Sequence, residues 1–352
     1  MRKWSYRGPD LLYKTGMSEL KNITIADVAK HANVSKSTVS QYLNKRYEYM
    51  SEKTRKKIEE TIKELNYEPN IIARSLKQKS TFTVGVVVAN ILHTFSTQII
   101  RAIENYFYQQ DFHIIVCNAD DEPKKEKKYI EMLRAKQVDG IIIFPTGGNL
   151  ELYKRMKRDE FPIVFMDRTI QDLGITTVML DNHLAAKLAV DHFVEKGYEN
   201  IAIVTTSIIR NISPRVERIQ GYKDALQAHD LPVHPDYIKT ADVEKIPAAL
   251  SELFALAKPP EAILAGNDIV LNEVLRYMKK YGLKIPEDAA VIGIDDVSYA
   301  DFYTPPITTV KQPAIEMANL AAELLLNQIK KTGSVDTSVH RLKPILLPRS
   351  SC

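Results

Sequence analysis

Polar side chains with the chemistry to read DNA bases lie close together at residues 36–41. Lys36 can meet the acceptor atoms of guanine or a phosphate, and Gln41 can form two hydrogen bonds with adenine, a contact usually worth about 1–3 kcal/mol. Ser37 lies on the same predicted helix. Because short polar side chains near the start of a helix can reach base edges in the major groove, these three residues are candidates for sequence-specific DNA contacts.

Hydroxyl and amide side chains around this group suit contacts with phosphates, which fix the register of a protein on DNA without reading its sequence. The residues expected to make them are Ser35, Thr38, Ser40 and Asn44, with Thr24 on the preceding helix. The alternative is that these residues are helix caps and ordinary surface residues. For Ser35 the two roles are equally expected, since one hydroxyl can serve both.

A second group of polar residues follows buried, apolar segments. Asp167 and Arg168 end the segment PIVFMDR, and Gln312 ends TTVKQ. Asn267 in AGND and Asp295 in GIDD also come directly after apolar runs, where side chains project into a cleft. Residues at strand ends are often caps or hydrogen-bond partners between lobes, so each of these alone is a weak signal for ligand binding.

Catalysis is the least expected use of these residues. Asp295 and Asp296 are adjacent, and neighbouring residues at a strand end point to opposite sides, which is poor geometry for acid/base work. No nucleophile motif, phosphate loop or metal-ligand cluster accompanies them. Cys117 and Cys352 have neither disulfide nor metal-ligand spacing, and a reducing compartment fits them. We therefore expect no catalytic residue, no metal and no cofactor.

Short helices must position the predicted DNA-contacting residues around 36–41. Ile25, Val28, Ala29 and Ala32 recur on one helical face, and Thr24 with Asp27 forms a capping signal before them. A second helix is predicted from Ser35, after a three-residue turn, and a third from about Ser51. Two short helices joined by a tight turn, with a third beside them, are typical of a helix-turn-helix headpiece.

Positive charge is concentrated in the same part of the chain. Residues 1–80 carry 17 Lys and Arg against 9 Asp and Glu, a net charge of +8, whereas residues 81–352 carry 31 against 35, a net charge of −4. Phosphate neutralisation supplies much of the affinity for nucleic acid, so this asymmetry fits a DNA-binding arm on a larger body. The charge asymmetry alone is equally well explained by a solvated basic surface that binds no nucleic acid.

The remaining chain alternates apolar runs with amphipathic stretches. The predicted strands are 83–89, 113–118, 140–145, 162–167, 176–180, 200–206, 262–266, 290–295 and 308–312, and the predicted helices are 97–110, 124–136, 183–196, 215–228 and 270–281. Most of the strands are rich in Val and Ile, which is typical of parallel strands buried on both faces. The alternation is too long for one ordinary sheet, so we expect two α/β lobes that meet near Leu180, with a ligand cleft between them.

The N-terminal segment lacks the apolar core of a signal peptide, and no later run approaches membrane-spanning length. We therefore expect a cytoplasmic protein without a membrane partner. Met17 is a plausible initiation point, so residues 1–20 are expected to be an N-terminal extension that is disordered or arises from a misassigned start.

The segments 24–44, 51–77 and 84–95 together resemble the LacI/GalR family of bacterial regulators. The resemblance implies a helix-turn-helix domain at 21–68, a hinge helix and linker at 69–80, and an effector-binding and dimerisation domain of two α/β lobes at 81–352. Paired hinge helices in a homodimer would fold on operator DNA. The hinge residues implied to contact double-stranded DNA are Asn70, Ala73, Arg74, Leu76 and Lys77, with Leu76 as an apolar wedge in the minor groove.

The second half of the resemblance is to sensing domains that are similar to periplasmic sugar-binding proteins. It implies that an aromatic ring and planar polar groups bind a sugar between the lobes. Phe95 is the one aromatic left where the family usually has two, and Arg218 in RIQGY matches a family arginine. The effector-binding residues implied are Phe95, Asp167, Arg168, Arg218, Asn267, Asp295 and Gln312.

The effector's chemistry is suggested by charge. Arg168 and Arg218, with Arg210 and Arg215 nearby, offer more guanidinium than a neutral sugar needs, so an acidic sugar derivative is preferred. The segments 41–51, 144–153 and 208–219 also resemble repressors of 2-keto-3-deoxygluconate and pectin-breakdown genes in Bacillus-like bacteria, which favours 2-keto-3-deoxygluconate as inducer. Ribose or another neutral sugar is the main competitor, a co-repressor is a second alternative, and a sugar-acid enzyme is a remote one.

Overall fold

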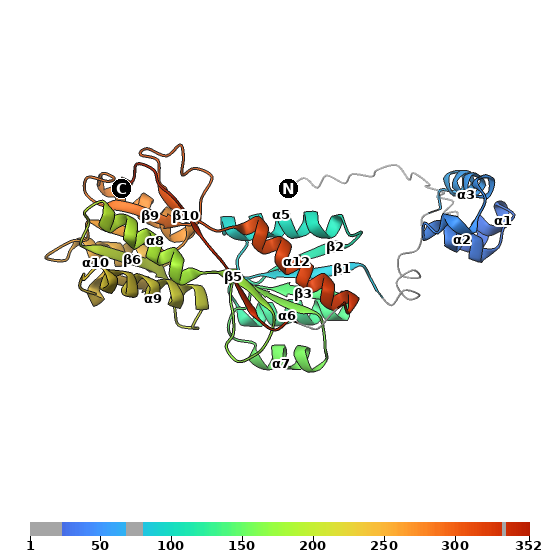
Figure 1. The fold of residues 1–352 in the computed structure, drawn as a ribbon, viewed down its shortest axis with the longest axis horizontal. Coiled ribbons are helices and arrows are strands. Elements are labelled where there is room, and N and C mark those ends of the chain that lie inside the picture. Colours follow the sequence, from blue (N-terminus) through green and yellow to red (C-terminus); the bar gives the residue numbers. More distant parts are fainter. Residues whose placement is uncertain (1–22, 68–79, 333–335) are drawn as a thin grey trace, which may run out of the picture. The chain divides into compact units, whose positions relative to one another are not determined.

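The computed structural model describes residues 23–67, 80–332 and 336–352, and its contacts divide the chain into two compact units, 1–79 and 80–352 (Figure 1). The predicted hinge contacts at Asn70, Ala73, Arg74, Leu76 and Lys77 lie outside the described residues, as does the extension at 1–20. They stay predictions.

The first unit contains the predicted helix-turn-helix. Its helices are α1 (Ile25–His31), α2 (Lys36–Leu43), a short 3-10 helix (Tyr47–Tyr49) and α3 (Glu52–Glu64). The Asp27 carboxylate accepts a hydrogen bond of 2.8 Å from the Thr24 backbone N–H at the start of α1. The small apolar core consists of Val28, Ala29, Ala32, Val39, Ile58 and Tyr67. Capping and apolar periodicity therefore produce the fold that the sequence predicts.

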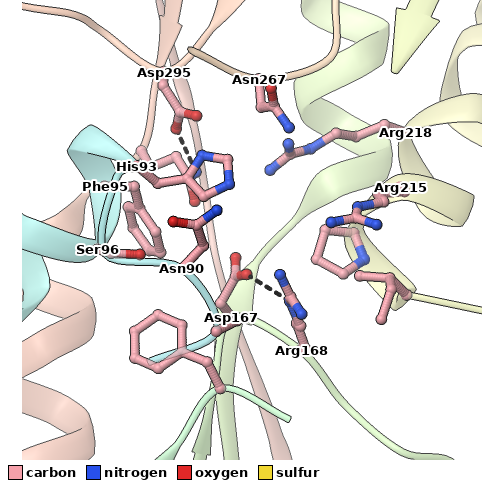
Figure 2. A pocket seen from close by; sticks show the side chains of 15 residues that line it. Asn90, His93, Phe95, Ser96, Asp167, Arg168, Arg215, Arg218, Asn267 and Asp295 are labelled. Carbon is pink, nitrogen blue, oxygen red and sulfur yellow. Dashed lines mark hydrogen bonds and ion pairs between the residues drawn. The ribbon is translucent and has the colours of Figure 1, made fainter. Parts of the chain in front are cut away.

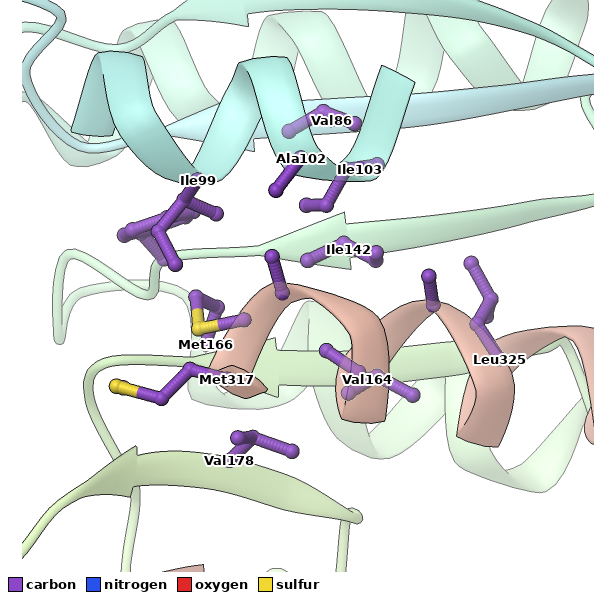
Figure 3. Packing of buried hydrophobic residues seen from close by; sticks show 14 of the residues in the cluster. Val86, Ile99, Ala102, Ile103, Ile142, Val164, Met166, Val178, Met317 and Leu325 are labelled. Atoms are coloured by element: carbon purple, nitrogen blue, oxygen red, sulfur yellow. The ribbon is translucent and has the colours of Figure 1, made fainter. Parts of the chain in front are cut away.

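The second unit begins with a six-stranded sheet in the order β11-β5-β4-β3-β1-β2, which forms the first lobe. Its strands are β1 (Thr83–Val88), β2 (His113–Asn118), β3 (Gly140–Ile143), β4 (Ile163–Met166), β5 (Thr177–Leu180) and β11 (Val339–Leu342), all paired in parallel. Helices α5 (Thr94–Tyr108) and α12 (Ala314–Lys330) cover one face, where Ile99, Met166 and Met317 share one apolar cluster (Figure 3). Helices α6 (Pro123–Ala135) and α7 (Leu150–Arg158) cover the other face.

The second lobe has its own six-stranded sheet, in the order β12-β10-β9-β8-β6-β7. Its strands are β6 (Ile201–Thr206), β7 (Ile238–Ala241), β8 (Ala262–Ala265), β9 (Ala290–Ile294), β10 (Thr308–Lys311) and β12 (Ile345–Leu347). Helices α8 (Asn182–Glu195) and α9 (Ser213–Ala228) cover one face, and α10 (Ile246–Phe254) and α11 (Asp268–Tyr281) the other. Short 3-10 turns, Pro235–Tyr237 and Val243–Lys245, flank β7.

The two α/β lobes are confirmed, but their division near Leu180 is only one of three crossings. The chain also passes between the lobes after Lys311 and again after Leu342, so that α12 and β11 return to the first lobe. The sequence analysis did not predict α7, α10, α12, β7, β11 and β12. Strand β2 lies at an edge of the first sheet and is partly exposed, and β12 pairs antiparallel with β10.

None of the helices in the described part of the chain is both long enough and apolar enough to span a membrane.

Candidate functional site

The predicted DNA-contacting residues of the headpiece gather around the start of α2. Lys36 and Ser37 are exposed and Gln41 is half-buried, so the first two are accessible from solvent. Ser35 caps α2, because its hydroxyl accepts a hydrogen bond of 3.1 Å from the Thr38 backbone N–H. The structure thus gives Ser35 the capping role, and this role leaves phosphate binding by the same hydroxyl open.

Other predicted phosphate contacts also take part in local hydrogen bonds. The Thr24 hydroxyl donates to Asp27 at 2.7 Å, and the side-chain amide of Asn44 donates to the Ser40 carbonyl at 2.7 Å. Thr38 and Ser35 share a hydroxyl–hydroxyl contact of 2.8 Å. These bonds stabilise the ends of α1 and α2, and the DNA contacts of these residues remain predictions.

All seven predicted effector residues line one pocket of the second unit. Phe95, Asp167 and Arg168 come from the first lobe, and Arg218, Asn267, Asp295 and Gln312 follow or border the sheet of the second (Figure 2). They converge because the carboxyl ends of parallel strands meet at one edge of a sheet, and here two such edges face each other. The structure therefore brings the predicted residues together, while their binding of a ligand stays a prediction.

The pocket holds little free space, about 50 Å³. A water molecule needs about 10–15 Å³ of such cavity space, so the cavity has room for a few waters and not for a sugar. A ligand of that size would have to displace side chains or separate the lobes.

Arg168 is neutralised within the first lobe. This guanidinium is 6% exposed, pairs with the Asp121 carboxylate at 2.7 Å and lies 3.5 Å from a carboxylate oxygen of Asp167. Burial acts to raise the pKa of Asp121, but the charges of Arg168 and Arg215 outweigh it and lower that pKa. Asp121 therefore remains ionised beside Arg168.

Asp121 also connects the two lobes. Its carboxylate lies 3.5 Å from the guanidinium of Arg215 on α9, and its backbone carbonyl accepts a hydrogen bond from Arg210. Burial and the nearby charge of Arg168 lower the pKa of Arg215 to about 10, so Arg215 is still charged at neutral pH. Two of the arginines that suggested an acidic ligand thus already share one carboxylate.

Arg218 has a different environment. It is 4% exposed, and its guanidinium donates to the side-chain oxygen of Asn182 at 2.9 Å and to the Gly266 carbonyl at 2.6 Å. Both acceptors are neutral, and among the described residues no carboxylate forms an ion pair with Arg218. Arg218 therefore has no direct ionic partner among the described residues, although its charge acts on the nearby carboxyl group of Asp295.

Asp295 is buried and accepts a hydrogen bond of 2.6 Å from the Gln312 side-chain amide. Burial and the neighbouring charge of Asp268 raise the pKa of Asp295. The amide oxygen of Gln312 and the Nε of Arg168 are buried in the described structure without hydrogen-bond partners. An unsatisfied buried polar atom is costly, so the Gln312 oxygen is a candidate acceptor for a ligand's hydroxyl group, whereas the Arg168 Nε lies 3.5 Å from the Asp167 carboxylate.

The sequence analysis missed several wall residues. Asn90, His93 and Ser96 follow β1, so the same strand-end reasoning that selected Asn267 could have found Asn90 and His93. The further lining residues are Ala89, Phe144, Ile212 and Pro214, together with Arg215, which the sequence analysis named only for its charge. The apolar ones carry no signal that separates them from core residues.

Known proteins match both units. The profile described as "Bacterial regulatory proteins, lacI family" matches residues 24–70, and the profile described as "Periplasmic binding protein-like domain" matches residues 190–352. The "Probable HTH-type transcriptional regulator EndR" of Paenibacillus polymyxa is 47% identical over 332 residues, which cover 93% of this chain and 98% of that protein. The "HTH-type transcriptional regulator KdgR" of Bacillus subtilis is 33% identical over 330 residues, 93% of this chain and 97% of that protein.

A solved structure has the same fold over nearly the whole chain. The "transcriptional regulator CelR-cellobiose complex" superposes with a TM-score of 0.71 at 26% identity and covers 94% of this chain and 100% of that one. The relatives EndR and KdgR are named as transcriptional regulators, which agrees with the expectation that this chain is a regulator and not an enzyme. From its helix-turn-helix headpiece, its two-lobed α/β unit and this similarity, we conclude that the chain belongs to the LacI family of bacterial transcription regulators.

Proposed function

We propose that the chain is a repressor of carbohydrate catabolism genes that binds a pseudo-palindromic operator as a homodimer and is released when a small sugar or sugar acid binds between the lobes. The observation that carries this proposal is the pocket wall, in which polar residues of both lobes converge on one small cavity. A ligand held by both lobes changes their spacing, and that change can alter the affinity for DNA.

The wall has the chemistry that a carbohydrate requires. Phe95 and Phe144 supply apolar ring surface for C–H groups, and the Gln312 amide oxygen, which has no hydrogen-bond partner in the described structure, can accept a hydrogen bond from a hydroxyl. The small free volume supports coupling between binding and lobe movement, because a sugar cannot occupy the pocket as it stands.

A sugar acid, with 2-keto-3-deoxygluconate as the first candidate, is the proposed inducer. Arg218 supports it, since a carboxylate would supply the ionic partner that the two neutral acceptors do not. The 33% identity to KdgR extends over almost the full chain and supports the same choice.

A neutral sugar is the second candidate. It is favoured by the pairing of Arg168 and Arg215 with Asp121, which leaves less positive charge for an anionic ligand than the sequence suggests. The similar CelR structure contains cellobiose, a neutral sugar. Whether the ligand releases the DNA or strengthens DNA binding is decided by the same experiment.

Thermal-shift titrations of the full chain with 2-keto-3-deoxygluconate, ribose and cellobiose test the ligand class. Gel shifts on the chain's own promoter region, with and without each compound, test its effect. We expect 2-keto-3-deoxygluconate to raise the melting temperature and to weaken DNA binding. Stabilisation by ribose or cellobiose alone would refute the acidic ligand, and tighter DNA binding with the ligand would refute the role as inducer.

A further inference from the structure

The first turn of helix α5, in the first lobe, is capped by a side chain of the second lobe. Its N-cap residue, His93, provides no side-chain hydrogen bond to the first turn. The backbone N–H of Thr94, the first residue of α5, instead donates a hydrogen bond of 2.7 Å to the carboxylate of Asp268. Asp268 lies at the start of α11, 174 residues further along the chain. A free helix N–H is thus satisfied across the cleft.

Asp268 makes a second contact with the first lobe. Its other carboxylate oxygen lies 2.5 Å from Nδ1 of His93, whose ring is in the pocket wall. Asp268 is 3% exposed, and burial acts to raise its pKa, but the hydrogen bonds and charge of His93 outweigh burial and lower that pKa. The carboxylate is therefore ionised in a dry site, where charge-assisted hydrogen bonds are strong.

A local role in α11 does not account for these contacts. Asn267 already caps α11, since its side-chain oxygen accepts a hydrogen bond of 2.9 Å from the Val270 N–H. Asp268 does bond the N–H of Ile269, at 2.8 Å, but both of its carboxylate oxygens are also engaged by the first lobe. On the pocket side, the Asp268 N–H lies 3.4 Å from the Asp295 carboxylate.

We propose that Asp268 is a positioning residue of the sensing unit, which holds the first turn of α5 and the ring of His93 against the ligand-binding residues of the second lobe. It is not in the pocket wall. It lies between Asn267 and the contacts with α5, so a ligand that moves Asn267 or Asp295 shifts the anchor of α5. The effect on ligand binding rests on the proposed function, whereas the anchoring of α5 does not.

Hydrogen exchange of the full chain tests the anchor without a ligand. Asp268→Asn keeps the side-chain volume and removes the charge. We expect the amides of residues 94–98 to exchange about tenfold faster, the factor expected from losing roughly one hydrogen bond, while residues 100–108 and 271–281 keep their protection. The matched control is Asp236→Asn, an exposed aspartate of the second lobe, which should leave all these amides unchanged. Unchanged exchange at 94–98 in Asp268→Asn would overturn the proposal.

A second variant removes the donor and leaves the second lobe intact. Thr94→Pro deletes the N–H at the first helical position, where proline is well tolerated, and the backbone of His93 (φ −71°, ψ 131°) suits a residue before proline. We expect faster exchange at residues 268–271, several-fold above the wild type. If Asp268→Asn loses hydrogen-exchange protection over the whole chain, because it fails to fold, the Thr94→Pro variant tests the anchor instead. Unchanged exchange at residues 268–271 in Thr94→Pro would then overturn the proposal.

The two proposals fail in different ways. If no sugar or sugar acid stabilises the wild type but exchange rises at 94–98 in Asp268→Asn, the proposed ligand class fails and the anchor stands. If a ligand binds and releases DNA but exchange is unchanged in Asp268→Asn, only the anchor fails.

Discussion

Gly221 lies where α9 passes very close to α8. A Cβ atom at this position would lie 2.4 Å from the carbonyl oxygen and 2.8 Å from the Cα of His183, both backbone atoms that no rotamer change can move. Ordinary van der Waals contact begins at about 3.4 Å, so Gly221→Ala requires a shift of α9 by about 1 Å. Arg218 lies one turn earlier on the same helix and would move with it.

Two opposing effects set the size of the change. Alanine is favoured over glycine within a helix by about 1 kcal/mol, and overpacking of a close contact costs about 1–3 kcal/mol. We therefore expect a net loss of up to about 2 kcal/mol of unfolding free energy in urea denaturation. Displacement of Arg218 should also weaken ligand binding about tenfold, which corresponds to about 1.4 kcal/mol, in calorimetric titration with the ligand that stabilises the wild type.

Gln227→Ala is the matched control, because Gln227 is exposed on the same helix and its substitution creates no contact. It should change stability by less than about 0.5 kcal/mol. If Gly221→Ala instead stabilised the protein by the full helix-propensity gain of about 1 kcal/mol, this would contradict the conclusion that α8 and α9 lie too close together for a Cβ atom at this position.

Three further predictions concern the two sites. Gln41→Ala should cost about 1–3 kcal/mol of operator affinity and relax preference at one base pair, measured by anisotropy on operator and single-base variants, and equal loss on every sequence would contradict base reading. Asp121→Asn should raise affinity for sugar acids relative to neutral sugars, because it removes the charge that neutralises Arg168 and Arg215, and an unchanged ratio in calorimetry would argue against this. Asp295→Asn should be more stable than the wild type at neutral pH, in thermal unfolding across pH. Because the pKa of Asp295 is raised on folding, the folded state retains a proton that the unfolded chain has lost, so wild-type stability falls as pH rises above its ordinary pKa. The advantage of the variant should therefore vanish in acid, and a constant difference at all pH values would contradict the raised pKa.

The headpiece could be predicted in detail because its signals are local. Thr24 with Asp27, and Ser35, mark helix starts, and the spacing of Val28, Ala29 and Ala32 marks the buried face. These features act within one or two helical turns, so no knowledge of distant partners is needed to interpret them.

The pocket could be predicted from a simple regularity, since Asp167, Asn267 and Asp295 each follow an apolar strand whose carboxyl end faces the cleft. What could not be predicted was the partner of each charge. The sequence shows several arginines in the predicted site, but only the fold shows that Asp121, which follows β2, pairs with two of them, Arg168 after β4 and Arg215 on α9. Pairing across lobes depends on the whole topology.

Two of the three crossings between the lobes, those after Lys311 and after Leu342, were missed for the same reason. Residues 314–330 pack against β3, β4 and β5, although they follow a strand of the second lobe. Local apolar patterning shows that a segment is amphipathic and does not say which sheet it covers. Asp268 and its partner Thr94 are similarly distant in sequence.

The most direct test of the account is a fluorescence anisotropy titration of the full chain on a duplex from its own promoter region, with and without the stabilising ligand, for the wild type and Arg218→Gln. The account predicts salt-dependent operator binding by both proteins, weakened at least about tenfold by the ligand in the wild type and unaffected by it in the variant. A wild type that ignores this DNA at moderate salt, or that holds it equally with every ligand, would contradict the account.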